Sequence, residues 1–201
     1  MGITVVLLCL QTRLFSKLSW TCNAQVCLSG GCSSNMCPLD SRDAYPTVKR
    51  VLKKYEDSVH FILHLFPLPY HRNAFLAAQS LKVIAAFNSS AVFDWVDVYF
   101  ENFGLFTNQA TADLSFLEIA QSIQIIASHK VGISRDEFLA GVQPGTDFDF
   151  ETRTSWKYAC SRGITGAPVF LLNGVKIDAD ESWTEQQWHK LLSPFLPSRS
   201  S

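Results

Sequence analysis

The sequence lacks a block of basic residues, a long apolar segment and a phosphate-binding loop. Its net charge is −1, and a nucleic-acid interface needs clustered Lys and Arg, so we expect no nucleic-acid partner. No window of ~18 apolar residues occurs, which predicts no transmembrane segment. We also find no Ser-His-Asp arrangement suited to nucleophilic catalysis. The chemistry must therefore come from other side chains.

The composition is that of a globular protein. The chain has 201 residues, of which 47% are hydrophobic and 17% are charged. This length suits one domain, or one domain with an insertion. Such a chain can bury roughly 70% of the surface that it exposes when unfolded.

Four of the six cysteines recur at every fifth position: Cys22, Cys27, Cys32 and Cys37. Zinc sites use Cys pairs that are closer together, about two to four residues apart, and the first histidine is His60. The spacing therefore favours disulfide-forming or adventitious cysteines over structural zinc. We predict no metal site.

The N-terminal segment gives the weakest signals. Ile3–Leu10 is apolar and could be a buried strand or the hydrophobic core of a signal peptide. A signal peptide would place the protein in the secretory pathway or outside the cell, and otherwise it is cytoplasmic. The basic residues follow this run instead of preceding it, which is the wrong polarity for a signal. Residues 11–36 show no periodicity, and we expect them to be poorly ordered.

From Asp40 the pattern becomes regular. A helix is predicted to begin at Ser41 or Asp43 and to run to about Tyr55, with Pro46 near its first turn. Ser58–Phe66 is rich in apolar residues and predicts a buried strand. Five helices are expected to follow, over 73–87, 91–102, 114–129, 134–142 and 149–162, and a last helix over 184–192.

The segment between the last two helices, Gly163–Gly174, contains a loop, a proline and a hairpin. Pro168 stands at the start of the short apolar strand Val169–Leu172, where a missing N–H is tolerated. Asn173-Gly174 is a strong signal for a two-residue hairpin turn. X–Pro is the bond that is readily cis. The local pattern alone favours the commoner trans bond. Read with the first-helix segment and the helical block, it predicts a cis Ala167–Pro168 bond.

Three stretches resemble the DsbA-like thioredoxin-fold family, and within it a plant-type eukaryotic subgroup with a Cys-Pro-Asp-Ser motif: Cys37–Pro46, His64–His71 and Ser161–Pro168. The resemblance covers residues 37 to about 195. It implies an α/β thioredoxin-like fold with a helical insertion. The implied parts are an atypical segment 1–36, a first half 37–66, an insertion 67–145 and a second half 146–197.

The resemblance also implies a redox-type site. Cys37 would be the catalytic thiol, and Thr165, Gly166, Ala167 and Pro168 would form the facing substrate loop. A thiol at a helix N-terminus meets the positive end of the helix dipole, which stabilises its thiolate. The partners would be protein or peptide thiols and disulfides.

The sequence departs from the family pattern in two ways. Asp40 and Ser41 stand where a second cysteine would follow Cys37, so no resolving thiol is present at the usual spacing. Cys32 could resolve from the N-terminal side. The segment directly before Cys37 is polar and glycine-rich, so we expect the N-terminal strand to be missing or displaced.

Four other features have mostly structural interpretations. We expect His64 to be a strand residue, His71 to end a solvated loop and Cys160 to be a buried free cysteine. Asn88-Ser89-Ser90 is a glycosylation sequon, which matters if the chain is secreted.

Three functions remain open from the sequence. The chain could be a monothiol thiol-disulfide oxidoreductase, with glutathione as a second thiol and otherwise no cofactor. It could instead be a catalytically degenerate module that binds peptides or partner proteins at the Pro168 loop. A glutathione-transferase-like enzyme is the third reading.

Overall fold

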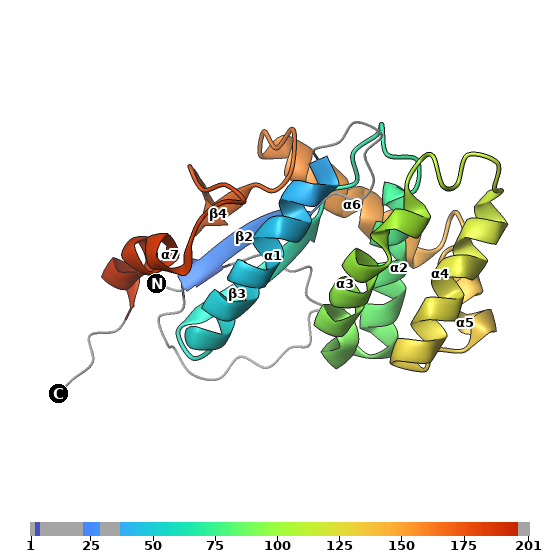
Figure 1. The fold of residues 1–201 in the computed structure, drawn as a ribbon, viewed down its shortest axis with the longest axis horizontal. Helices are drawn as coiled ribbons and strands as arrows, with labels where there is room; N and C mark the ends of the chain where they lie inside the picture. The colour runs from blue at the N-terminus through green and yellow to red at the C-terminus, as the bar shows by residue number, and fades with distance from the viewer. Residues whose placement is uncertain (1–2, 5–21, 29–36, 197–201) are drawn as a thin grey trace. The chain divides into compact units, whose positions relative to one another are not determined.

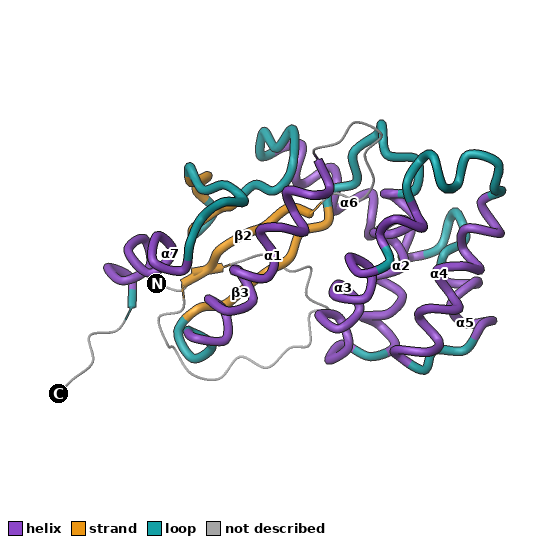
Figure 2. The backbone as a smooth tube through the Cα atoms, in the orientation of Figure 1, coloured by secondary structure: helices purple, strands orange, loops and turns teal. Residues whose placement is uncertain are grey.

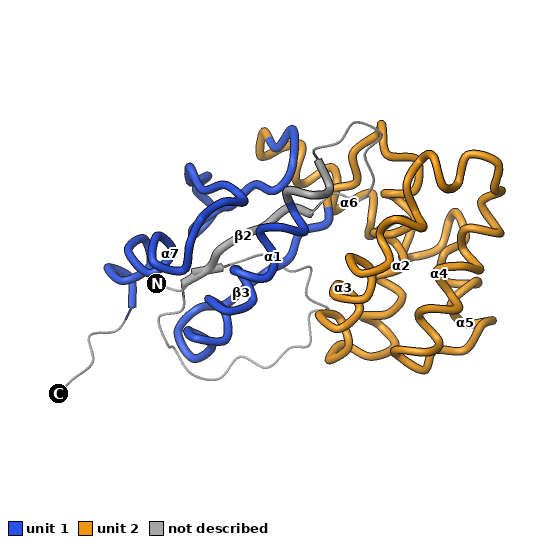
Figure 3. Tube along the Cα trace, viewed as in Figure 1, with its two compact units in different colours: residues 1–28, 38–65, 164–201 blue, residues 29–37, 66–163 orange. Residues whose placement is uncertain are grey.

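The computed structural model describes residues 3–4, 22–28 and 37–196 (Figure 1). The chain divides into two compact units, coloured separately in Figure 3. The sheet unit comprises residues 1–28, 38–65 and 164–201, and the helical unit comprises residues 29–37 and 66–163. Figure 2 colours the described strands orange, and the residue ranges of all of them fall in the sheet unit. No helix in the described part of the chain is long and apolar enough to cross a membrane.

The sheet unit is built on a five-stranded sheet of order β1-β3-β2-β4-β5. Its strands are β1 (Ile3–Thr4), β2 (Cys22–Leu28), β3 (Val59–Leu65), β4 (Phe170–Leu172) and β5 (Val175–Ile177). Strand β2 runs parallel to β3 along its whole length and antiparallel to β4. The pairing places β2 between these two strands. The β3 strand predicted from Ser58–Phe66 is confirmed.

We expected the N-terminal strand to be missing or displaced, and the structure has it displaced along the chain. β2 supplies the central strand, and it ends at Leu28 while the next helix begins at Cys37. This strand lies inside residues 11–36, which we expected to be poorly ordered. Asn23 and Gln25 alternate with the apolar residues of Cys22–Val26, a strand pattern that the prediction missed because it is short, whereas pairing with strands on both sides defines the strand in the structure. Residues 5–21 and 29–36 lie outside the described residues, as does most of the predicted Ile3–Leu10 strand.

Helix α1 (Cys37–Lys54) begins earlier than the sequence predicts. It starts at Cys37 instead of at a cap residue Ser41 or Asp43, and Pro46 therefore lies in its interior instead of near its first turn. The proline removes one intrahelical hydrogen bond. The helix is held by an apolar face that is buried along its length, formed by Ala44, Tyr45, Val48 and Val51.

The hairpin after the last long helix matches its prediction. β4 and β5 pair in antiparallel fashion around Asn173 and Gly174, whose φ angles are 52° and 81°. Two positive φ values are what a type I′ turn requires, which explains the Asn-Gly pair. The Ala167–Pro168 bond before β4 is cis, as predicted. Helix α7 (Glu185–Leu192) packs on this strand, because the rings of Phe170 and Trp188 meet edge to face at 4.9 Å.

The helical unit contains the five predicted helices, with boundaries shifted by at most two residues. They are α2 (Ala74–Phe87), α3 (Val92–Glu101), α4 (Phe116–Val131), α5 (Arg135–Gly141) and α6 (Asp147–Ser161). Capping boxes at Ser115 and Ser134 fix the starts of α4 and α5. Asn73 precedes α2 as predicted, but its side chain does not cap the helix. It donates instead to Phe106 O and Thr111 Oγ1, at 2.9 and 2.7 Å. The domain boundaries implied by the resemblance stay predictions.

Candidate active site

Cys37 is the first residue of the eighteen-residue helix α1. The first turn of a helix leaves backbone N–H groups without intrahelical partners, and the aligned peptide dipoles place partial positive charge there. This is the local setting in which a thiolate is stabilised and its pKa falls. The backbone therefore places Cys37 at a helix N-terminus, as the predicted site requires. The role of Cys37 itself stays a prediction.

The positions where a resolving thiol could stand lie one helical turn further along α1. Asp40 and Ser41 occupy them, so neither can release a mixed disulfide. Ser41 is fully buried, and its Oγ has no hydrogen-bond partner among the described residues. Next to it, Arg42 and Asp43 form an exposed ion pair at 3.4 Å.

The proline loop follows α6 and leads into β4. Gly163 ends the helix with a φ of +72°, a conformation that favours glycine. Ala167 is buried, Thr165 is exposed, and Gly166 and Pro168 are half-buried. A Cβ atom added at Gly166 would meet nothing within 4 Å. The loop thus combines a buried anchor with open backbone that an extended peptide could reach.

Four of the five predicted site residues form this one loop, and all four belong to the sheet unit together with α1 from Pro38 onward. Cys37 groups with the helical unit. The predicted facing arrangement of Cys37 and the Pro168 loop, and the substrate-binding role of the loop, stay predictions.

Two expectations about individual residues are wrong. Cys160 is exposed on α6 instead of buried. His71 is 2% exposed instead of solvated, because hydrogen bonds from Asn108 Nδ2 to Tyr70 O and from Arg72 N to Asn108 Oδ1 hold the loop down. Burial lowers the pKa of His71, so its ring is neutral near pH 7.

We searched the described residues for metal ligands. No group of three or more His, Cys, Asp or Glu side chains lies close enough together to hold an ion within residues 3–4, 22–28 and 37–196. Cys32, a member of the five-residue cysteine series, lies outside these ranges.

Sequence reasoning overlooked a cavity in the helical unit. Its walls come from the loop after β3, the start of α2 and one face of α6, and its lining includes Arg72, Arg153 and Lys157. A signal was present in the sequence, because Arg153, Trp156 and Lys157 stand three and four residues apart and share one helix face.

The profile of the thioredoxin family matches residues 33–193. The chain belongs to the thioredoxin family. The comparison of this sequence with curated proteins found no match.

Solved structures with the DsbA-like fold resemble the thioredoxin-family chain over most of its length. A proposed protein-disulfide isomerase from Pseudomonas syringae has a TM-score of 0.69 and 16% identity, covering 86% of this chain and 92% of its own. BdbD from Bacillus subtilis has a TM-score of 0.62 and 12% identity, with 86% of each chain covered. MdbA from Actinomyces oris, a thiol-disulfide oxidoreductase, has a TM-score of 0.60 and 15% identity, covering 87% of this chain and 81% of its own. The predicted fold, an α/β thioredoxin-like domain with a helical insertion, is confirmed.

Proposed function

We propose that this protein is a thiol-disulfide oxidoreductase that acts through the single thiol of Cys37 on protein or peptide substrates. The observation that carries the proposal is the position of Cys37 as the first residue of α1. Membership of the thioredoxin family and the names of the structural neighbours MdbA and BdbD support it. The Pro168 loop would hold the substrate as an extended strand.

The proposed first step is an exchange that balances without a cofactor. The Cys37 thiolate attacks one sulfur of a substrate disulfide, a Cys37–substrate S–S bond forms, and the other substrate sulfur leaves as a thiolate that takes up a proton. The helix dipole at the start of α1 raises the fraction of Cys37 that is thiolate near neutral pH.

The second step needs a thiol from outside the motif, because Asp40 and Ser41 carry none. A glutathione thiolate would attack the Cys37 sulfur of the mixed disulfide, release the second substrate thiol and leave Cys37 glutathionylated. A second glutathione would then regenerate the Cys37 thiol and form oxidised glutathione. Glutathione is thus a co-substrate in this scheme.

A peptide-binding module without redox activity is the second candidate. The open backbone at Gly166, next to the buried anchor Ala167, favours it. In that case the loop would bind extended peptides, and substitution of Cys37 would leave binding unchanged.

We also infer a place in the secretory pathway and kinship with the plant-type subgroup, the latter from the Cys37–Pro46 stretch. The sequon Asn88-Ser89-Ser90 is exposed and lies at the junction between α2 and the following turn. A glycan at Asn88 would therefore meet solvent.

Trapping with oxidised glutathione tests the proposed function. At neutral pH we expect one rapidly formed glutathione adduct, which peptide mapping by mass spectrometry assigns to Cys37. The matched control is Cys160→Ser, which removes an exposed helical cysteine and leaves the rapid adduct in place. A rapid adduct on any other cysteine, or none on Cys37, would contradict the proposal.

A further inference from the structure

A cavity of about 380 Å³ lies within the helical unit. Its apolar lining includes Pro67, Leu68, Phe75 and Trp156. The indole of Trp156 is 37% exposed and stacks on buried Phe66, with ring planes 8° apart. Flat rings and proline faces therefore shape the apolar walls. The volume falls in the lower part of the range for small-molecule sites.

Cationic side chains complete the lining of this cavity. Arg72, Arg153 and Lys157 contribute to it, together with His71, and no Asp or Glu is among the lining residues. Lys157 is exposed and makes no ion pair or hydrogen bond with any described residue. Arg153 and Lys157 are four residues apart on α6, a like-charge spacing that costs helix stability.

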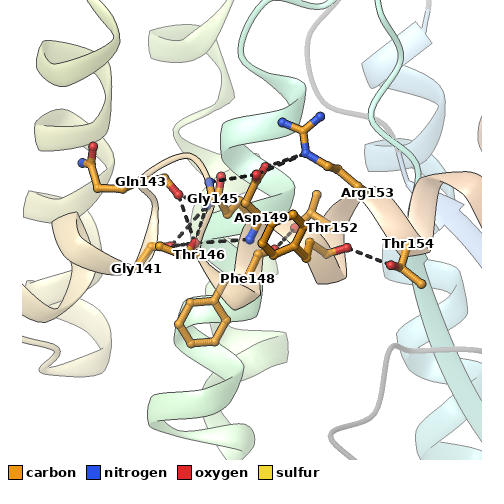
Figure 4. Close-up of polar contacts among 11 residues, drawn as sticks. Gly141, Gln143, Gly145, Thr146, Phe148, Asp149, Thr152, Arg153 and Thr154 are labelled. Atoms are coloured by element: carbon orange, nitrogen blue, oxygen red, sulfur yellow. Dashed lines mark hydrogen bonds and ion pairs between the residues drawn. The ribbon is translucent and has the colours of Figure 1, made fainter.

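Arg153 is held in place with its terminal nitrogens free. Its Nε donates to both carboxylate oxygens of Asp149, at 3.0 and 3.1 Å. Asp149 is itself buried and accepts from Gly145 N at 3.0 Å. Figure 4 shows the two terminal nitrogens of Arg153 extending away from this network, with no contact drawn to them. The guanidinium also lies 5.3 Å from the centre of the Phe75 ring, so its position is fixed from two sides.

Two further side chains of the lining, Arg72 and His71, are held by hydrogen bonds and by burial, respectively. The Arg72 guanidinium donates to the carbonyls of Thr111, Ala112 and Leu114, at 2.5 to 3.1 Å. His71 is only 2% exposed. Neither of its ring nitrogens has a hydrogen-bond partner among the described residues. A buried polar ring without hydrogen-bond partners is unfavourable.

The geometry points to a binding site for a small aromatic carboxylate in this cavity. The two free terminal nitrogens of Arg153 suit a bidentate pair with a carboxylate. Lys157 adds a second cation, and Trp156 and Phe75 offer flat apolar surface to an aryl ring. Asp149 offsets part of the Arg153 charge, so Lys157 supplies charge that no described carboxylate neutralises.

Calorimetric titration of the full chain with 2-naphthoate and with its neutral analogue 2-naphthamide tests this site. We expect saturable binding of one naphthoate per chain, about tenfold or more tighter than the amide. Raising the salt concentration to about 0.5 M should weaken binding of the naphthoate more than that of the amide. Equal affinity for the two compounds, or no saturable binding of naphthoate, would overturn the proposal.

Two variants locate the site, and a third controls for charge. Lys157→Met removes a cation that has no described partner, and Arg153→Lys keeps the charge next to Asp149 but removes the planar fork. Each should weaken naphthoate binding by about threefold to tenfold. Lys130→Met, on the exposed end of α4, should leave it unchanged. Unaltered binding in both site variants would contradict the assignment. Cys37→Ser should bind naphthoate as the natural chain does, so this test is independent of the thiol chemistry.

Discussion

The two units differ in where their polar groups lie. In the sheet unit the described polar contacts between side chains are mostly exposed, such as the Arg50–Glu185 ion pair at 2.6 Å and the contact between Tyr55 and His189. In the helical unit, several polar and charged side chains that form contacts are buried. Gln79 donates to two backbone carbonyls at 3.1 Å, Asn73 and Asp149 are buried and bonded, and Lys82 is buried beside Glu151.

This difference separates two tasks. In the function that we propose, the sheet unit provides the Pro168 loop and α1 from Pro38 onward, while Cys37 groups with the helical unit. The helical unit contains the helical insertion of the thioredoxin-like fold. It also holds cationic side chains, a buried neutral histidine and a cavity. We infer that exchange chemistry depends on Cys37, α1 and the Pro168 loop, and small-anion binding on the cavity.

The largest effect should come from Cys37→Ser. Loss of the nucleophile should lower glutathione-dependent reduction of insulin disulfides by roughly 100-fold or more. Naphthoate binding in the helical unit should persist. The variant would then separate thiol exchange from anion binding. The matched variant Cys160→Ser should keep its rate. Retained activity in Cys37→Ser would break the assignment of chemistry to the start of α1.

Asp40→Cys should restore a resolving thiol three residues after Cys37. The mixed disulfide could then be released within the chain, so the rate of substrate release should rise about tenfold or more at low glutathione and depend less on its concentration. Ser41→Cys is the positional control, because it moves the thiol by one residue into a buried position. An unchanged dependence on glutathione in Asp40→Cys would show that Cys37 does not form the mixed disulfide.

Lys82→Met tests the cost of buried charge in the helical unit. Burial lowers the pKa of Lys82 to about 8 from 10.5, although Glu151 at 3.7 Å offsets part of that effect. Below pH 8 both the folded and the unfolded chain carry the charge, so the methionine should raise the free energy of unfolding by up to about 3 kcal/mol at pH 7.

The pH dependence of Lys82→Met follows from the same lowered pKa. Between pH 8 and 10.5 the unfolded chain binds more protons than the folded chain, so the natural protein gains stability and the advantage of methionine disappears. Urea unfolding across this range measures it, with Lys130→Met as the exposed control. An advantage that does not shrink as the pH rises would contradict the burial account.

The smallest expected effects compare helix caps between the units. Thr184 caps α7 in the sheet unit and Ser134 caps α5 in the helical unit, each through a capping box. Alanine at either position should cost about 1 kcal/mol of unfolding free energy, measured by urea titration. If the two units unfold separately, the losses will appear in different transitions, whereas coincident transitions would show that the units unfold as one.

The sequence was informative where structure is decided locally. The helix starts near Ser134 and Thr184 and the Asn173-Gly174 turn each depend on a few neighbouring residues, and the structure places these elements as predicted. The cis Ala167–Pro168 bond is confirmed, but its prediction also needed the first-helix segment and the helical block, because the local pattern alone favours trans. The family and the fold could be inferred from three short stretches, because each stretch is a local sequence pattern.

Features that depend on distant residues were missed. The apolar-polar alternation of β2 covers only Cys22–Val26, too short a run to predict a strand, and its pairing with β3 and β4 across the sheet makes it one. His71 is buried because Asn108, far along the chain, holds its loop. The shared helix face of Arg153, Trp156 and Lys157 is visible in the sequence, but the cavity also needs the loop after β3 and the start of α2, which that local pattern does not encode.

The most direct test of the central claim is the alkylation rate of Cys37 as a function of pH, in the native chain and in urea. Iodoacetamide labelling followed by peptide mapping gives the rate for this residue alone. The account predicts that native Cys37 reacts faster than the unfolded residue near pH 6 to 7, with a thiol pKa below the ordinary value of about 8.5. A native rate equal to or below the unfolded rate would contradict it.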